Sequence, residues 1–335
     1  MKIVKPNVEI MRSGLETEFM TPEQFIERVG RTCYKSEDKI TETSAAKFVS
    51  NLIKRGHEAM VEHWTLIFKA ATPGIYDLIK LDMHRFVEDT TLDIEHPVPH
   101  LRFTCKNYGD KHRCIISGNV RAWRDFARIT FAGYGLIPPY LRSVMKAYPV
   151  FFPEYQDWVQ GINNMSSALM PISVSDLRGR KEHSVHHDVT VKFTTDRGIS
   201  HEIVRHREAS YAQESTRYCN YSGDKYGKEI SVVEPIDIYN LVNGHQAYDS
   251  WADACLDGEL GYFNMLSNGC TPQTARSVLP TCTKTEVIMT APLGEWDHVF
   301  GLRCAPDAHP DIQHVMKLAR NEFYALFPER YNTEV

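Results

Sequence analysis

Residues 199–218 read ISHEIVRHREASYAQESTRY and contain three arginines, Arg205, Arg207 and Arg217, within thirteen residues. Guanidinium groups bind phosphates and other planar anions through paired hydrogen bonds. The first two arginines point the same way only where the backbone is extended, because on a helix they would lie well apart around the axis. The segment therefore predicts a loop that binds one or two phosphorylated ligands. An exposed charged face fits equally well, with the arginines paired to three nearby glutamates: Glu202, Glu208 and Glu214.

A strand is expected before this loop, because Val189, Val191 and Phe193 alternate with other residues. The expected elements after it are a loop, a long helix, a strand and two further helices: 210–218, 246–266, 283–289, 294–302 and 310–327. Apolar spacing upstream predicts two helices and the start of a buried strand: 21–34, 42–55 and 64–68.

Residues 70–188 differ from the rest by their many prolines and short helical stretches. We expect helices over 75–87 and 120–132, and we interpret this part as a mainly helical inserted subdomain. The remaining residues, 1–69 and 189–335, are expected to form one domain. The predicted fold class is α+β, with an antiparallel sheet and helices packed on it.

The composition of the 335 residues is that of a globular protein, with 42% hydrophobic and 24% charged residues. The net charge of −5 argues against a non-specific nucleic-acid binder. No apolar run is long enough to span a membrane, and the first residues lack the apolar core of a secretory signal. We therefore expect a cytoplasmic enzyme. Its eight cysteines include no CxxC pair and are expected to be reduced.

The string RHREASYAQES, residues 205–215, resembles the signature of the flavin-dependent thymidylate synthases: Arg-His-Arg, seven residues, then Ser. Further blocks resemble this family in the same order: RTCY at 31–34, RGHEAMVEH at 55–63, ARSVLP at 275–280, GLR ending at Arg303, and AHP at 308–310. The resemblance spans the chain except for about 70–188. It implies the fold of this family with an insertion.

The resemblance also implies a reaction. Members methylate dUMP to dTMP with 5,10-methylenetetrahydrofolate, using FAD reduced by NADPH and no cysteine nucleophile. They are homotetramers with shared active sites, which implies the same for this chain. Partners are therefore expected to be dUMP, folate and NADPH, with neither nucleic acid nor membrane.

Residue roles follow from the matched positions. Arg303 is expected against the uracil edge, where a cation stabilises negative charge developing on the ring; favourable placement at a helix C-terminus is the alternative. His57 is expected against the flavin or folate, and the roles of Glu62 and His63 stay open. The other expected FAD contacts are Ala59, Arg205, His206, Arg207, Gln213 and His298. The expected dUMP contacts are Glu202, Arg205, Gln213, Ser215, Arg217, Arg276 and Arg303.

The chain departs from the family pattern at two places. It has Ala212-Gln213 where members often have Asn-Glu, and Pro292-Leu293-Gly294 where they have Asn-x-Arg. The missing pattern recurs in SGNVRAWRDF, residues 117–126. Asn119 and Arg121 are therefore hypothesised to supply the absent FAD contacts. The alternative is a capped helix, with Asn119 as N-cap and Trp123 and Phe126 in the core.

A histidine-rich stretch forms another cluster: His183, His186, His187 and Asp188. Such residues can bind zinc, but without a second ligand pair we favour a solvated loop and predict no metal site. Two other functions stay open: a metal-dependent hydrolase, and a nucleic-acid-binding module in which three tyrosines stack on bases, namely Tyr211, Tyr218 and Tyr221. A flavin reductase that does not bind dUMP is a further possibility.

Overall fold

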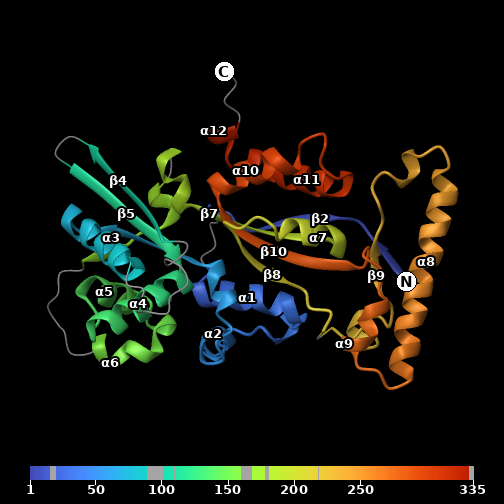
Figure 1. The fold of residues 1–335 in the computed structure, drawn as a ribbon, viewed down its shortest axis with the longest axis horizontal. Helices are drawn as coiled ribbons and strands as arrows, with labels where there is room; N and C mark the ends of the chain where they lie inside the picture. Colours follow the sequence, from blue (N-terminus) through green and yellow to red (C-terminus); the bar gives the residue numbers. More distant parts are fainter. Residues whose placement is uncertain are drawn as a thin grey trace. The chain divides into compact units, whose positions relative to one another are not determined.

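A computed structural model describes residues 1–15, 20–88, 101–108, 111–159, 168–177, 181–217 and 219–331 (Figure 1). The chain divides into two compact units. Unit 1 comprises Met1–Ser13, Arg28–Lys39 and Val189–Val335, and unit 2 comprises Gly14–Glu27 and Ile40–Asp188. Helix α1 (Pro22–Tyr34) contributes residues to both. Helices and antiparallel sheets occur in each unit, which confirms the α+β class.

Unit 1 is built on a four-stranded sheet. In spatial order its strands are β2 (Asn7–Arg12), β7 (Asp188–Asp196), β10 (Lys284–Pro292) and β8 (Ser210–Gln213). Two of its pairings, β2 with β7 and β8 with β10, are antiparallel. A separate parallel pair joins β1 (Lys2–Val4) to β9 (Ser231–Val233). Strand β7 confirms the strand predicted from its alternating apolar residues, and it is buried on both faces along most of its length.

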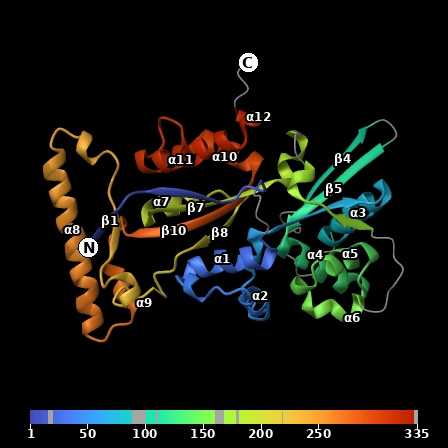
Figure 2. The same cartoon turned by 180° about the vertical axis from the view of Figure 1, so that it is seen from behind.

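The helices of unit 1 cover this sheet and extend beyond it. They are α7 (Arg197–Ile203), α8 (Gly244–Ser267), α9 (Pro272–Ala275), α10 (Leu293–Arg303), α11 (Pro310–Leu326) and α12 (Pro328–Tyr331). Helices α10 and α11 lie together on one face of the sheet, whereas α8 lies at the end of the unit near β1 and β9 (Figure 2). Among the described residues, no helix combines the length and apolar character needed to cross a bilayer.

Unit 2 has a second four-stranded sheet. Its strands, in spatial order, are β4 (Arg102–Tyr108), β5 (Lys111–Asn119), β3 (Thr65–Ala70) and β6 (Leu169–Pro171). Its helices are α2 (Ser44–Lys54), α3 (Pro73–Glu88), α4 (Val120–Tyr134), α5 (Pro139–Ala147) and α6 (Gln156–Val159). The core between them is rich in aromatic residues, among them Phe68, Trp123, Phe126 and Phe151, each fully buried.

Each unit contains its own strand-to-helix junction, and the two junctions are built in the same way. In each, a nine-residue strand passes directly into a helix: β5 into α4, and β10 into α10. A buried tryptophan in the first turns of each helix donates its indole N–H to a carbonyl oxygen of the neighbouring strand. The bond from Trp123 to Leu66 is 3.4 Å, and that from Trp296 to Val189 is 3.1 Å. Both helices are therefore fixed on their sheets by the same contact.

Most expected elements are present, but several predictions are wrong. The segment expected to be a loop over 210–218 begins with strand β8. Residues 70–188 also contain the β4–β5 hairpin, which was not predicted. Cys105 and Cys114 face each other in this hairpin and are joined by a disulfide, contrary to the expectation that the cysteines are reduced.

The domain division remains a prediction. The strand predicted from Trp64 and the strand at Val189 lie in different sheets, as β3 and β7. Residues 40–69 belong to the same compact unit as residues 70–188. We therefore keep the insertion at residues 70–188 as a proposal.

Candidate functional site

A cluster in unit 1 forms around Arg303, the last residue of α10. Its Nε donates to Nε2 of His206 at 3.1 Å, its Nη1 donates to a carboxylate oxygen of Glu202 at 2.8 Å, and its Nη2 donates to the Glu202 carbonyl at 3.1 Å. Three residues predicted to bind ligands are thus in direct contact. A guanidinium group has five N–H donors, so two remain for another acceptor.

His206 is held neutral in this cluster. It is buried, and its Nε2 accepts a hydrogen bond from Arg303, which places the ring proton on Nδ1. Burial, the Arg303 cation and His298 together lower the pKa of His206 to about 4. His206 therefore adds a dipole and no charge near neutral pH.

Glu295 and His298 complete the group on the side of α10. Glu295 lies 3.9 Å from Nδ1 of His206, and the two histidine rings meet edge to face with centroids 6.3 Å apart. The ligand atoms of these three side chains lie within 4.8 Å of one another, which is the spacing of a possible metal site. The Arg303 cation hydrogen-bonded to His206 disfavours a second cation there.

The arginine loop begins where α7 ends at Ile203. Arg205 and Arg207 are exposed on either side of the buried His206. The Tyr211 hydroxyl fixes the loop by donating to the carbonyls of Ile203, at 3.0 Å, and His206, at 2.7 Å. In the part of the chain that the structure describes, no ion pair involves either exposed arginine.

Contacts within the loop argue against two alternatives: an exposed face in which the arginines pair with glutamates, and a nucleic-acid-binding surface of stacking tyrosines. Of the three glutamates considered as partners for the arginines, Glu202 pairs with Arg303, and Glu214 pairs with Lys284. The hydroxyl of Tyr211 is engaged, Tyr221 is buried, and Tyr218 lies outside the described residues. Neither exposed arginine therefore has an ion-pair partner among the described residues, and the buried Tyr221 cannot stack on a base.

A second group of predicted residues lies just after β8. Arg276 donates to the Thr216 hydroxyl at 3.1 Å, and the Arg217 amide donates to Ser215 Oγ at 3.3 Å. The Gln213 side-chain amide already donates to Ser200 at 2.8 Å and to Thr285 at 3.3 Å. Only the carbonyl oxygen of Gln213 thus remains for a ligand.

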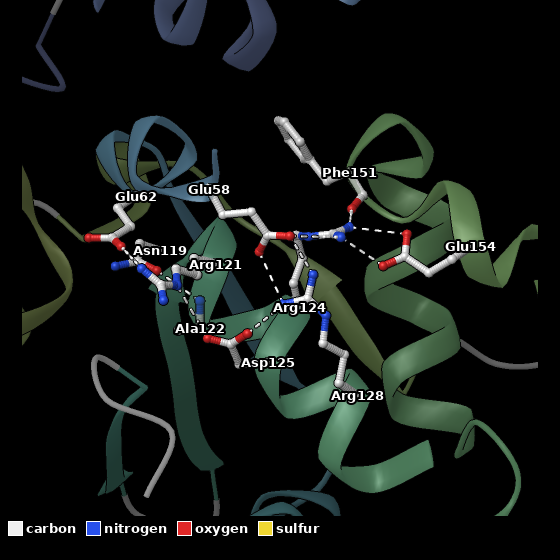
Figure 3. A network of polar contacts seen from close by, with 10 residues as sticks. All are labelled: Glu58, Glu62, Asn119, Arg121, Ala122, Arg124, Asp125, Arg128, Phe151 and Glu154. Carbon is white, nitrogen blue, oxygen red and sulfur yellow. Dashed lines mark hydrogen bonds and ion pairs between the residues drawn. The ribbon is translucent and has the colours of Figure 1, made fainter. Parts of the chain in front are cut away.

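Four further predicted residues belong to unit 2, namely His57, Ala59, Asn119 and Arg121. The first two are exposed: His57 directly precedes the short helical turn Glu58–His63, and Ala59 lies within it. Asn119 accepts from the Ala122 amide at 2.8 Å and therefore caps α4. Arg121 donates to Glu62 at 2.6 Å (Figure 3). These contacts, with Trp123 and Phe126 buried, favour the capped helix; they do not test a FAD contact.

A buried charge network in unit 2 escaped the sequence analysis. Glu58 accepts from Arg124 at 3.2 Å and from Arg128, and Arg124 also bonds to Glu154 at 2.7 Å and to the Phe151 carbonyl (Figure 3). Burial acts to raise the pKa of Glu58, but the two arginines outweigh it and lower the pKa. The sequence did contain a sign of this network: Arg121, Arg124 and Arg128 are three and four residues apart along α4, which places them on one face of the helix.

The histidine-rich stretch is also structural. His186 is completely buried, and its two ring nitrogens lie 2.8 Å from the Thr104 hydroxyl and 2.7 Å from the Ser117 hydroxyl. Asp188 accepts from Arg102 at 2.5 Å and from Thr65. The predicted solvated loop is thus wrong at these positions, and neither ring nitrogen of His186 is available to a metal. The side chain of His183 lies outside the described residues.

Comparison with known proteins decides the family. Residues 161–329 match the family model described as thymidylate synthase complementing protein. The chain belongs to this family. The matched range includes the Arg303 cluster and the segment after β8, whereas His57, Ala59, Asn119 and Arg121 lie outside it.

Curated relatives carry the name flavin-dependent thymidylate synthase. The relative from Geobacter sulfurreducens is 36% identical over 117 residues, which cover 35% of this chain and 47% of the relative. The relative from Pyrococcus furiosus is 31% identical over 119 residues, which cover 36% of this chain and 47% of the relative. The relative from Synechocystis sp. is 29% identical over 150 residues, which cover 42% of this chain and 68% of the relative. The chain spans about half the length of the first two relatives.

Proposed function

We propose that this chain is a flavin-dependent thymidylate synthase that converts dUMP to dTMP with 5,10-methylenetetrahydrofolate, FAD and NADPH. The carrying observation is the Arg303 cluster, which joins three residues of the family pattern through direct hydrogen bonds. We also propose, from the resemblance, a cytoplasmic homotetramer with shared active sites.

The exposed arginines fit FAD. Arg205 and Arg207 carry two cations without ion-pair partners among the described residues, and the FAD pyrophosphate carries two negative charges. His206, His298 and the Gln213 carbonyl are proposed to contact the same cofactor, and the resemblance implies Ala59 as a further contact. Contacts from Asn119 and Arg121 remain a hypothesis beside the capped helix. When bound, FAD supplies hydride transfer.

The segment after β8 fits dUMP. The Ser215 hydroxyl and the guanidinium groups of Arg217 and Arg276 are the expected phosphate ligands, because hydroxyls and guanidinium forks are the usual donors to phosphate. Glu202 holds Arg303 through two hydrogen bonds and leaves two guanidinium donors for the uracil edge. Arg303 then stabilises negative charge that develops on the ring.

Four of the free thiols support a reaction without a cysteine nucleophile. Burial raises the pKa of Cys33 and of Cys255 to about 12, and burial also raises the pKa of Cys282 and Cys304. A thiol attacks as the thiolate, which these environments disfavour.

The first test is an absorbance spectrum of the purified chain with FAD. NADPH is then added anaerobically with and without dUMP, and dTMP is measured after 5,10-methylenetetrahydrofolate is supplied. Bleaching of the flavin bands and formation of dTMP are expected. Bleaching without dUMP binding would identify a reductase instead, and failure to bind FAD would refute the proposal.

A further inference from the structure

Four charged side chains form a closed group in unit 1, here named the charge ring: Lys35, Glu214, Lys284 and Glu286. Lys284 Nζ lies 2.9 Å from a carboxylate oxygen of Glu214 and 2.7 Å from one of Glu286. Lys35 Nζ lies 2.5 Å from the same Glu286 oxygen and 3.9 Å from Glu214. Two cations and two anions therefore balance each other.

The charge ring is largely removed from water. The side chain of Glu214 is 3% exposed, and the other three are between 15% and 18% exposed. Burial acts to raise the pKa of Glu286, but Lys284 and Lys35 outweigh it and hold the pKa at about 2. Glu286 is thus charged at neutral pH, and removing a lysine leaves a buried carboxylate without part of its compensating charge.

The backbone at Lys35 gives independent support for a role of its side chain. Lys35 follows the last residue of α1 and has a φ of 48°. Glycine is usual at this position after a helix, because a side chain is disfavoured in the left-handed region. A lysine here retains a less favourable backbone conformation, and its ammonium group joins the charge ring.

The charge ring adjoins the proposed nucleotide segment. Glu214 directly precedes Ser215, and the Glu214 amide donates to the carbonyl of Glu286 at 2.8 Å. The Ser215 amide donates to the carbonyl of Cys33, two residues before Lys35, at 3.0 Å. The end of α1, the end of β8 and the start of β10 therefore meet at the residue that precedes the phosphate-binding hydroxyl.

We propose that the charge ring positions Ser215 and Arg217 to bind the phosphate of a nucleoside monophosphate, an inference that rests on the proposed function. Its four members are positioning residues. Because their charges are mutually satisfied, the carboxylates add no net repulsion toward a phosphate.

The first variants are Lys284→Met, which removes one cation, and Lys284→Arg, which restores it. Loss of positioning is expected to raise the KM for dUMP about tenfold in Lys284→Met, with kcat changed less than about twofold. Reduction of bound FAD by NADPH without dUMP should be unchanged. Lys284→Arg should recover most of the affinity for dUMP.

A second pair of variants tests the proposal without placing an unfavourable residue in the backbone. Lys35→Gly removes a cation of the ring while favouring the backbone, and Lys228→Gly makes the same exchange at φ 57° on an exposed lysine outside the ring. The dUMP affinity is expected to fall about tenfold in Lys35→Gly and to stay unchanged in Lys228→Gly. Direct dUMP titration of the flavin spectrum measures both.

The outcomes separate two failures. Equal dUMP affinity in folded Lys35→Gly and Lys228→Gly would refute the charge ring as a positioning device. An equal loss of FAD and dUMP binding in Lys35→Gly would also refute it, because the defect would not be confined to the nucleotide segment. Absence of dUMP binding in the unaltered chain would refute the proposed function itself.

Discussion

The buried arginine of α4 permits a quantitative test of what stabilises unit 2. The perturbation is Arg124→Met, which removes a side chain that is 2% exposed and bonded to Glu58, Glu154 and the Phe151 carbonyl. Methionine fills similar volume, so packing is largely kept. The change leaves Glu58 buried with Arg128 as its remaining guanidinium partner in the network of Figure 3.

The expected loss is large because breaking a buried ion pair by removing one partner costs about 3–5 kcal/mol. The matched control is Arg121→Met on the same helix, where the side chain is 48% exposed and paired with Glu62. An exposed pair contributes only about 0–1 kcal/mol. Urea unfolding followed by circular dichroism measures both variants. If Arg124→Met cost no more than Arg121→Met, the network would not stabilise the fold in this way.

Three further predictions concern the ligand site and pH. Arg303→Ala should lower the rate of dTMP formation about 10²–10³-fold with the FAD spectrum retained, as expected for lost charge stabilisation; an unchanged rate would exclude a role at the uracil. Ser215→Ala should raise the KM for dUMP by about tenfold, whereas Ser250→Ala on α8 should not; equal values in the two variants would remove Ser215 from the phosphate site. Glu286 has a folded pKa of about 2, below the value of 4.5 for an unperturbed group. Its stabilisation is therefore present above pH 4.5 and is lost as the pH falls toward 2, so Glu286→Gln should flatten the dependence of unfolding free energy on pH in that window, and an unchanged slope would contradict this.

Helices and strands of strong periodicity could be predicted from the sequence. The strand through Val189 and Phe193 and the long helix α8 appear close to their expected bounds, because each contains a clear period or a clear terminating residue. Strand β8 was missed because its four residues are polar or small, and its pairing with β10 depends on residues more than seventy positions away. The β4–β5 hairpin was missed for a different reason: its strands pair locally, but residues 70–188 were interpreted as mainly helical.

The sequence predicted which residues belong to the candidate site. It did not predict which of these residues contact one another. The Arg-His-Arg pattern identified the loop, but sequence could not indicate that Arg303 would bind both His206 and Glu202 from another helix. Such a contact depends on tertiary packing of α10 near the end of α7. The charge ring could not be predicted either, because Lys35 and Lys284 are about 250 positions apart in the sequence and meet only through Glu286.

The repeated strand-to-helix junction offers a physical reason why SGNVRAWRDF resembles a cofactor-binding segment. Asn119 and Pro292 occupy equivalent places with nearly equal backbone angles, φ −65° and −68°, ψ 162° and 153°. Four residues later, Trp123 and Trp296 make the same bond to the neighbouring strand. Packing therefore conserves the tryptophan contact at both junctions. The chemistry of the first turn is free to differ, since Arg121 stands where the other junction has Gly294. The shared junction accounts for the helix start and the tryptophan and leaves Asn119 and Arg121 unexplained, so a FAD role for these two residues requires its own measurement. If the Asn119→Ala, Arg121→Ala double variant folds and keeps its FAD affinity, the segment serves only the fold.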